Sequence, residues 1–86
     1  MENFQNSLTG CRLSLTLNSF RETIVLDYSV CNSGDFYYLS ITTGSFIPEI
    51  LITSLISLGF IFNSISIDDN RRDCLRVLFS IDSKDI

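Results

Sequence analysis

The chain of 86 residues has the length of one small domain, and ten acidic against six basic residues give it a net charge of −4. This balance argues against direct binding of nucleic acid, because neutralising phosphates requires clustered lysine and arginine side chains. Histidine does not occur, so the commonest general base and metal ligand is missing, which argues against an enzyme and against a bound metal or cofactor.

The first half of the chain predicts three strands. Residues 1–10 are polar and are expected to form a loose arm, whereas residues 11–18 alternate apolar and polar side chains, as in a half-buried strand. Residues 23–30 and 36–43 predict two more strands, joined by a turn at residues 32–35, where Asn and Gly tolerate positive φ. The apolar faces of these strands consist of Cys11, Leu13, Leu15, Leu17, Ile24, Leu26, Tyr28, Val30, Tyr37, Leu39 and Ile41.

One helix is predicted after the third strand, at residues 45–59. Ser45 is a suitable N-cap, Pro48 fits the first turn, and Gly59 can end the helix in a left-handed conformation. The outer half of this helix holds one charged residue, which is little for a surface that faces water. Two interpretations stay open: a solvent face rich in serine and threonine, or a contact with another protein or a second copy. The outer half consists of Glu49, Ile50, Thr53, Ser54 and Ser57, and the inner half of Ile47, Leu51, Ile52, Leu55, Ile56 and Leu58.

Two strands close the chain, at residues 60–67 and 74–81, with a hydrophilic hairpin loop at 68–73 and a tail at 83–86. In the fourth strand Ile61, Ile65 and Ile67 share one face, with Phe62 on the other. The predicted element order is therefore β-β-β-α-β-β. It describes a single α+β domain, residues 1–86, with two layers: a five-stranded, mainly antiparallel sheet and one helix packed on one face. Nothing in the predicted fold covers the opposite face of the sheet.

The hairpin loop carries Asp68, Asp69 and Asp73, which suggests a divalent cation as one possible ligand. The loop lacks the alternating acids and the distal Glu of a calcium loop, and Arg71 and Arg72 would repel a cation. A solvated loop tip, or a mixed contact with a protein, is the favoured interpretation.

Tyr38, Phe36 and Phe62 are predicted on the uncovered sheet face, where aromatic side chains can stack on RNA bases if basic residues surround them. Only Arg12 and Arg76 are expected on that face. A protein-contact patch, or ordinary half-exposed aromatic side chains, therefore fits better than an RNA platform.

Three cysteines, Cys11, Cys31 and Cys74, lack the C-x-x-C spacing of a zinc site, and their odd number argues against a disulfide scaffold. They favour a reducing compartment. Residues 1–10 contain no signal-peptide core, and the longest apolar run, residues 46–62, is too interrupted to cross a membrane. We expect a cytoplasmic protein, and the absence of alanine indicates an AT-rich genome such as that of a phage, mobile element or symbiont.

The predicted element order, the acidic balance, the small size and the weakly charged helix resemble class I secretion chaperones. This resemblance implies a homodimer built around such a helix. The flanking helices of that family have no counterpart in the elements predicted at either end of this chain.

We expect a non-enzymatic protein-binding module, in its most specific form a small acidic inhibitor of the immunity or phage anti-defence type. Such an inhibitor acts by occupying a partner's surface, and an acidic surface suits a basic partner. The alternative is a self-associating structural or secretion-chaperone-like subunit, with a homodimer as the expected assembly. The residues assigned to partner contact are Glu49, Ile50, Thr53, Ser57, Tyr38, Phe62, Asp68, Asp69 and Asp73.

Overall fold

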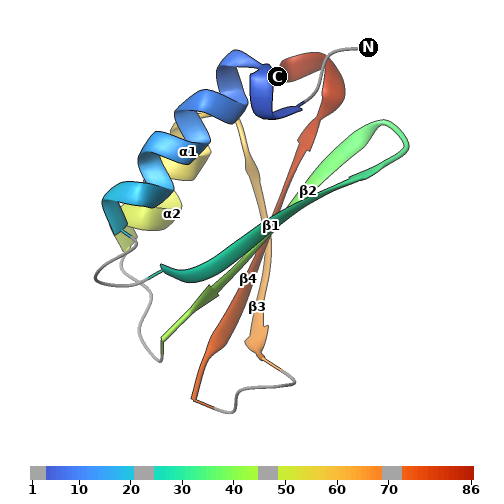
Figure 1. The fold of residues 1–86 in the computed structure, drawn as a ribbon. Coiled ribbons are helices and arrows are strands. Elements are labelled where there is room, and N and C mark those ends of the chain that lie inside the picture. The colour runs from blue at the N-terminus through green and yellow to red at the C-terminus, as the bar shows by residue number, and fades with distance from the viewer. Residues whose placement is uncertain (1–3, 21–24, 45–48, 69–72) are drawn as a thin grey trace.

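A computed structural model describes residues 4–20, 25–44, 49–68 and 73–86. It confirms an α+β fold with an antiparallel sheet (Figure 1). The predicted fifth strand is wrong, because the sheet formed by the described residues has four strands and is accompanied by two α-helices. The elements in order are η1 (Phe4–Asn6), α1 (Leu8–Phe20), β1 (Val25–Ser33), β2 (Phe36–Thr43), α2 (Glu49–Ser57), β3 (Ile61–Ile67), β4 (Leu75–Asp82) and η2 (Ser83–Asp85).

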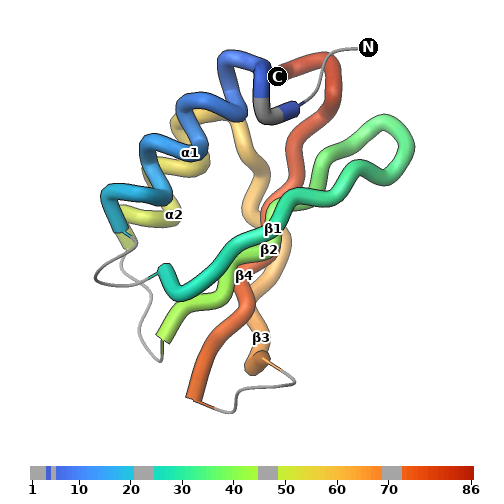
Figure 2. Tube along the Cα trace, in the orientation of Figure 1, coloured from blue at the N-terminus to red at the C-terminus, as the bar shows by residue number. Residues whose placement is uncertain are grey.

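The sheet has the strand order β1-β2-β4-β3, and each neighbouring pair is antiparallel. Strands β1 and β3 therefore form its two edges. Helices α1 and α2 lie side by side on one face, and no described element covers the other face (Figure 1). The hairpin end of β3 and β4 extends beyond the ends of both helices (Figure 2). The helix layer thus covers only part of the sheet.

Residues 11–18 belong to α1 and not to a strand, which corrects the prediction for this segment. Leu13 and Leu17 are almost fully buried, while Leu15 between them is 72% exposed. A strand would put all three on one face, whereas a helix turns Leu15 to the opposite side. Leu13 and Leu17 are four residues apart, a spacing that fits both the helical period of about 3.6 residues and the strand period of 2. The alternation of apolar and polar residues around them therefore favours a strand in the sequence, although the segment is helical.

The segment expected to be a loose arm is ordered from Phe4 onward, and that expectation does not hold for residues 4–10. Ser7 caps α1, since its Oγ accepts a hydrogen bond of 3.0 Å from the backbone N–H of Gly10. Phe4 is buried and its ring lies 4.9 Å from that of Tyr37, measured between centroids. At the other end, Ile86 packs partly buried against the core.

Helix α2 ends as the sequence predicts. Gly59 has φ +105°, its N–H donates to the carbonyl of Ile56 at 3.0 Å, and the N–H of Phe60 donates to the carbonyl of Leu55 at 3.2 Å. These two bonds form a Schellman motif, in which glycine adopts the left-handed conformation at lowest cost. The expected cap Ser45, the first-turn Pro48 and the inner residue Ile47 lie outside the described residues.

The hydrophobic core lies between the helix layer and the two central strands. The strand limits predicted for β2 and the inward orientation of Leu39 and Ile41 are confirmed. Ile56, expected on the inner half of α2, is instead 50% exposed. The buried apolar residues of the core are Phe4, Leu13, Leu17, Val25, Leu39, Ile41, Leu51, Leu55, Phe60, Val77, Phe79 and Ile81.

Candidate functional site

The edge strand β3 is exposed along its whole length, and it carries no charged residue in the sequence Ile-Phe-Asn-Ser-Ile-Ser-Ile. Ile61 is 57% exposed and Ile67 is 66% exposed. Soluble proteins normally protect an edge strand with charged side chains, proline or a covering element, since its free N–H and C=O groups can pair with another chain. Strand β3 is protected neither by charge nor by a described covering element.

The two faces of β3 differ from those predicted, because a register shift between Phe62 and Ser64 places an extra residue in the strand. Phe62 lies opposite Phe79 and therefore faces the helix layer, while Ile61 lies opposite Ser80 on the open face. Beyond the shift, isoleucines face the helix layer and serines the open face. The helix-side residues of β3 are Phe62, Ile65 and Ile67, and they are 39%, 45% and 66% exposed. Their exposure rises toward the hairpin end of the strand, which extends beyond the helices (Figure 1).

The outer side of α2 holds four of the residues predicted for partner contact. Glu49, Ile50, Thr53 and Ser57 are all exposed, and Ile50 is 61% exposed. The Thr53 hydroxyl donates to the carbonyl of Glu49 at 3.1 Å, and the Ser57 hydroxyl donates to the carbonyl of Ser54 at 2.6 Å. These hydroxyls are therefore satisfied by their own helix, which makes this side less hydrophilic than its serine and threonine content implies.

A second exposed stripe runs along α1 on the side opposite its buried leucines, and the sequence prediction missed it. Leu8 and Leu15 are 65% and 72% exposed, and Cys11 is exposed between them. Their spacing of three and four residues puts them on one side of a helix. The stripe exists only if residues 8–15 are helical, so the predicted loose arm and strand do not contain it.

The open sheet face carries Tyr38, as predicted, at 40% exposure. Its ring centroid lies 6.3 Å from that of Phe36. Phe62 does not join them, since it lies on the helix side of the sheet. The predicted three-membered aromatic patch is therefore wrong, and only two aromatic side chains of that set lie together.

The acidic hairpin loop is not the exposed cluster that the sequence suggests. Asp68 is only 6% exposed, with its Oδ2 3.6 Å from Nη2 of Arg76 and 3.5 Å from the hydroxyl of Thr42, which donates to it. This carboxylate is used inside the fold and is not free for a partner. Asp73 is exposed, and Asp69 lies outside the described residues. Among the described residues, no group of three or more His, Cys, Asp or Glu side chains could hold a metal ion.

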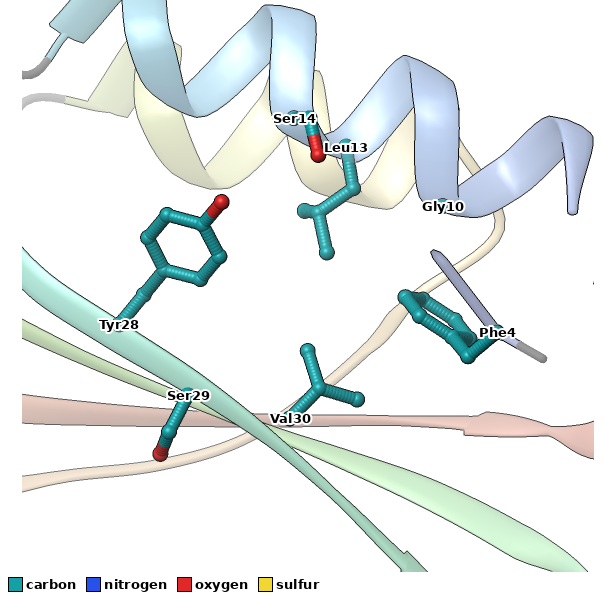
Figure 3. A pocket seen from close by; sticks show the side chains of 7 residues that line it. All are labelled: Phe4, Gly10, Leu13, Ser14, Tyr28, Ser29 and Val30. Carbon is teal, nitrogen blue, oxygen red and sulfur yellow. The ribbon is translucent and has the colours of Figure 1, made fainter. Parts of the chain in front are cut away.

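A cavity of about 450 Å³ lies between α1 and the edge strand β1 (Figure 3). Phe4, Leu13 and Val30 form apolar walls, and the side chain of Tyr28 extends from β1 toward α1 (Figure 3). None of the lining residues is charged. The cavity has the size of a small-molecule site. Its lining offers hydroxyl groups but no acid or base pair for catalysis.

Comparison with protein-family models, curated proteins and solved structures gave no match. Within the described ranges, neither helix is long and apolar enough to cross a membrane.

Proposed function

We propose that the protein is a non-enzymatic protein-binding module, which occupies a partner's surface with the outer side of its two-helix layer. The observation that carries this proposal is the charge content of that layer. Helices α1 and α2 contain only two charged residues, Arg12 and Glu49. Helices that face water normally carry charged and polar residues along the outer side.

Four large apolar side chains stand on this layer: Leu8, Leu15, Ile50 and Ile56, each at least half exposed. Burying the exposed half of a leucine or isoleucine contributes about 1 kcal/mol. Together the four supply a substantial share of the roughly 8 kcal/mol of a micromolar complex. The surface thus fits an apolar patch on another protein.

The acidic net charge supports an inhibitor that binds a basic partner. The exposed aspartates lie outside the apolar surface of the helix layer. Asp27, Asp35 and Asp73 are exposed on the strands and hairpins of the sheet. Such charges increase the rate of encounter with a partner of opposite sign more than they strengthen the final contact. In this proposal the helix layer supplies affinity, and the net charge of −4 favours the approach of a basic protein.

Affinity capture followed by binding measurements on the purified partner tests the proposal. We expect wild-type protein to retain a partner at micromolar concentration and Ile50→Glu to lose it. The matched control is Ser29→Glu, which adds the same charge to an exposed position of β1 outside the helix layer. If wild-type protein retains no partner, or if both variants bind the partner equally well, the proposed surface is wrong.

A self-associating subunit is the second candidate function. Strand β3 favours it, because this uncharged and exposed edge is a separate surface from the outer side of the helix layer.

A further inference from the structure

We propose that β3 pairs antiparallel with the β3 of a second copy, joining two four-stranded sheets into one of eight strands. Strand β3 is an edge of the sheet and carries four apolar side chains that are 39–66% exposed. This inference deepens the second candidate function, and it does not rest on the proposed protein-binding role, because it concerns the sheet edge and not the outer side of the helices.

The regular part of β3 is self-complementary. Ile65 and Ile67 lie opposite Val77 and Leu75 on the helix side, while Ser64 and Ser66 face the open side. Directly opposed residues of an antiparallel pair share one face of the sheet. A two-fold axis perpendicular to the sheet, passing near Ile65 or Ser66, therefore places isoleucine against isoleucine and serine against serine. No polar group in residues 64–67 has to face an apolar one.

Charge also selects this edge over the other. Strand β3 contains no charged residue, so two copies meet no like charges along the ladder, despite a net charge of −4 on each. Strand β1 carries the exposed Asp27 and a register shift next to it, between Val25 and Asp27. A charged side chain on the edge is one device by which proteins prevent edge pairing, and a bulge is another. Both edges contain a bulge, since β3 has its own register shift between Phe62 and Ser64. Only β1 adds a charged side chain, and residues 64–67 of β3 carry neither a charge nor a register shift.

The apolar area that β3 can bury limits the stability of the dimer. A strand of seven residues is about 23 Å long, and four half-exposed apolar side chains offer on the order of 300 Å². A stable dimer of standard size buries roughly 800 Å² on each partner. Strand β3 supplies less than that, so we expect a weak dimer that dissociates in the micromolar range.

This pairing keeps the helix layers of both copies on the same side of the joined sheet. The dimer would therefore present two helix surfaces in one direction. A partner with two copies of its own site would bind more tightly to such a dimer than to one chain.

Sedimentation equilibrium over a range of concentrations tests the dimer. We expect the mass to rise from the 9.7 kDa of one chain to twice that value as the concentration passes through the micromolar range. Ile65→Lys, which puts a charge in the middle of the ladder, should keep the mass at 9.7 kDa. Ile50→Glu, on the outer side of α2, should dimerise like the wild type. A wild-type mass that stays at one chain, or a dimer that survives Ile65→Lys, overturns the proposal.

Hydrogen exchange on the wild-type chain provides a second test that needs no variant to fold. We expect backbone amides within residues 61–67 to exchange more slowly in concentrated than in dilute solution, while those of the other edge, β1, do not change. Slower exchange in β1 alone would show that the wrong edge was chosen. Protection of β3 only when another protein is added would show that a foreign chain, and not a second copy, pairs with it. Neither outcome depends on the Ile50→Glu capture experiment, so the two proposals fail separately.

Discussion

Phe62 and Phe79 meet across the β3–β4 pair with their ring centroids 5.7 Å apart and their planes inclined by 72°. Phe79 is fully buried, whereas Phe62 is 39% exposed. The edge of the hydrophobic core therefore runs between these two neighbouring strands. The helix layer shields Phe79 completely but leaves every residue of β3 exposed, so β3 is a poorly protected edge of the described sheet.

This boundary predicts different costs for the same substitution. Phe79→Ala should lower the free energy of unfolding by about 3–5 kcal/mol, because it leaves a cavity in the core. Phe62→Ala should cost only about 1–2 kcal/mol, since part of that ring is already in water. Urea unfolding at protein concentrations below the range of the proposed dimer measures both. Equal losses would show that β3 is covered as completely as β4.

A second pair of variants separates a helix from a strand at residues 8–20. Leu13→Ala should lower the free energy of unfolding by about 3 kcal/mol, because Leu13 is 1% exposed in the core. Leu15→Ala should change it by no more than about 0.5 kcal/mol, since Leu15 is 72% exposed. Urea unfolding provides the comparison. Similar losses for both would favour the strand, in which the two leucines share one face.

Local signals explain why α2 could be predicted and α1 could not. Gly59 acts through its own backbone conformation, which depends on nearby residues alone. In α1 the spacing of the buried leucines fits both the helical period of about 3.6 residues and the strand period of 2. Packing against the sheet, and not a local signal, determines that this segment is a helix. One local signal does mark the start of α1: Ser7 is a suitable N-cap, and its Oγ accepts a hydrogen bond from the N–H of Gly10.

A candidate surface could be predicted from the sequence only where all its residues lie on one helix or strand with a regular spacing. The outer side of α2 follows from helical spacing, and Ile50 and Thr53 are exposed as expected. The exposure of β3 depends on how far the helices reach over the sheet, and its faces depend on a bulge set by pairing with β4. The burial of Asp68 depends on Thr42, which is 26 residues away in the chain. A contact between residues so far apart in the chain cannot be predicted from the pattern of neighbouring residues.

The end of α2 gives a third prediction. Gly59→Ala should lower the free energy of unfolding by about 1–2 kcal/mol, because a residue with a Cβ is strained at φ +105°. Space is not the cause, since the added Cβ would lie at an ordinary 3.5 Å from Ile81. Gly44→Ala is the matched control, because Gly44 does not have positive φ and its added Cβ meets no atom of the described part of the chain within 4 Å. Thermal unfolding should show a lower midpoint for Gly59→Ala only, and a neutral Gly59→Ala would argue against the Schellman end.

The two aspartates at the ends of the β3–β4 loop should differ in how much their substitution destabilises the fold. Asp68→Ala removes the acceptor of the Thr42 hydroxyl and the counter-charge of Arg76, whose Nε is buried without a hydrogen-bond partner among the described residues. We expect it to lower the free energy of unfolding by about 1–2 kcal/mol, at the lower end for a charged pair because Arg76 is partly exposed. Asp73→Ala should change it by no more than about 0.5 kcal/mol, since Asp73 is exposed.

Urea unfolding of Asp68→Ala, of Arg76→Met and of the double variant completes a double-mutant cycle, and Asp73→Ala is unfolded beside them for comparison. A coupling energy near zero between Asp68 and Arg76 would mean that the carboxylate is held by its other contacts and not by this arginine. Equal losses for Asp68→Ala and Asp73→Ala would contradict the buried position of Asp68. In that case the loop would again be a candidate for the exposed acidic contact that its sequence suggests.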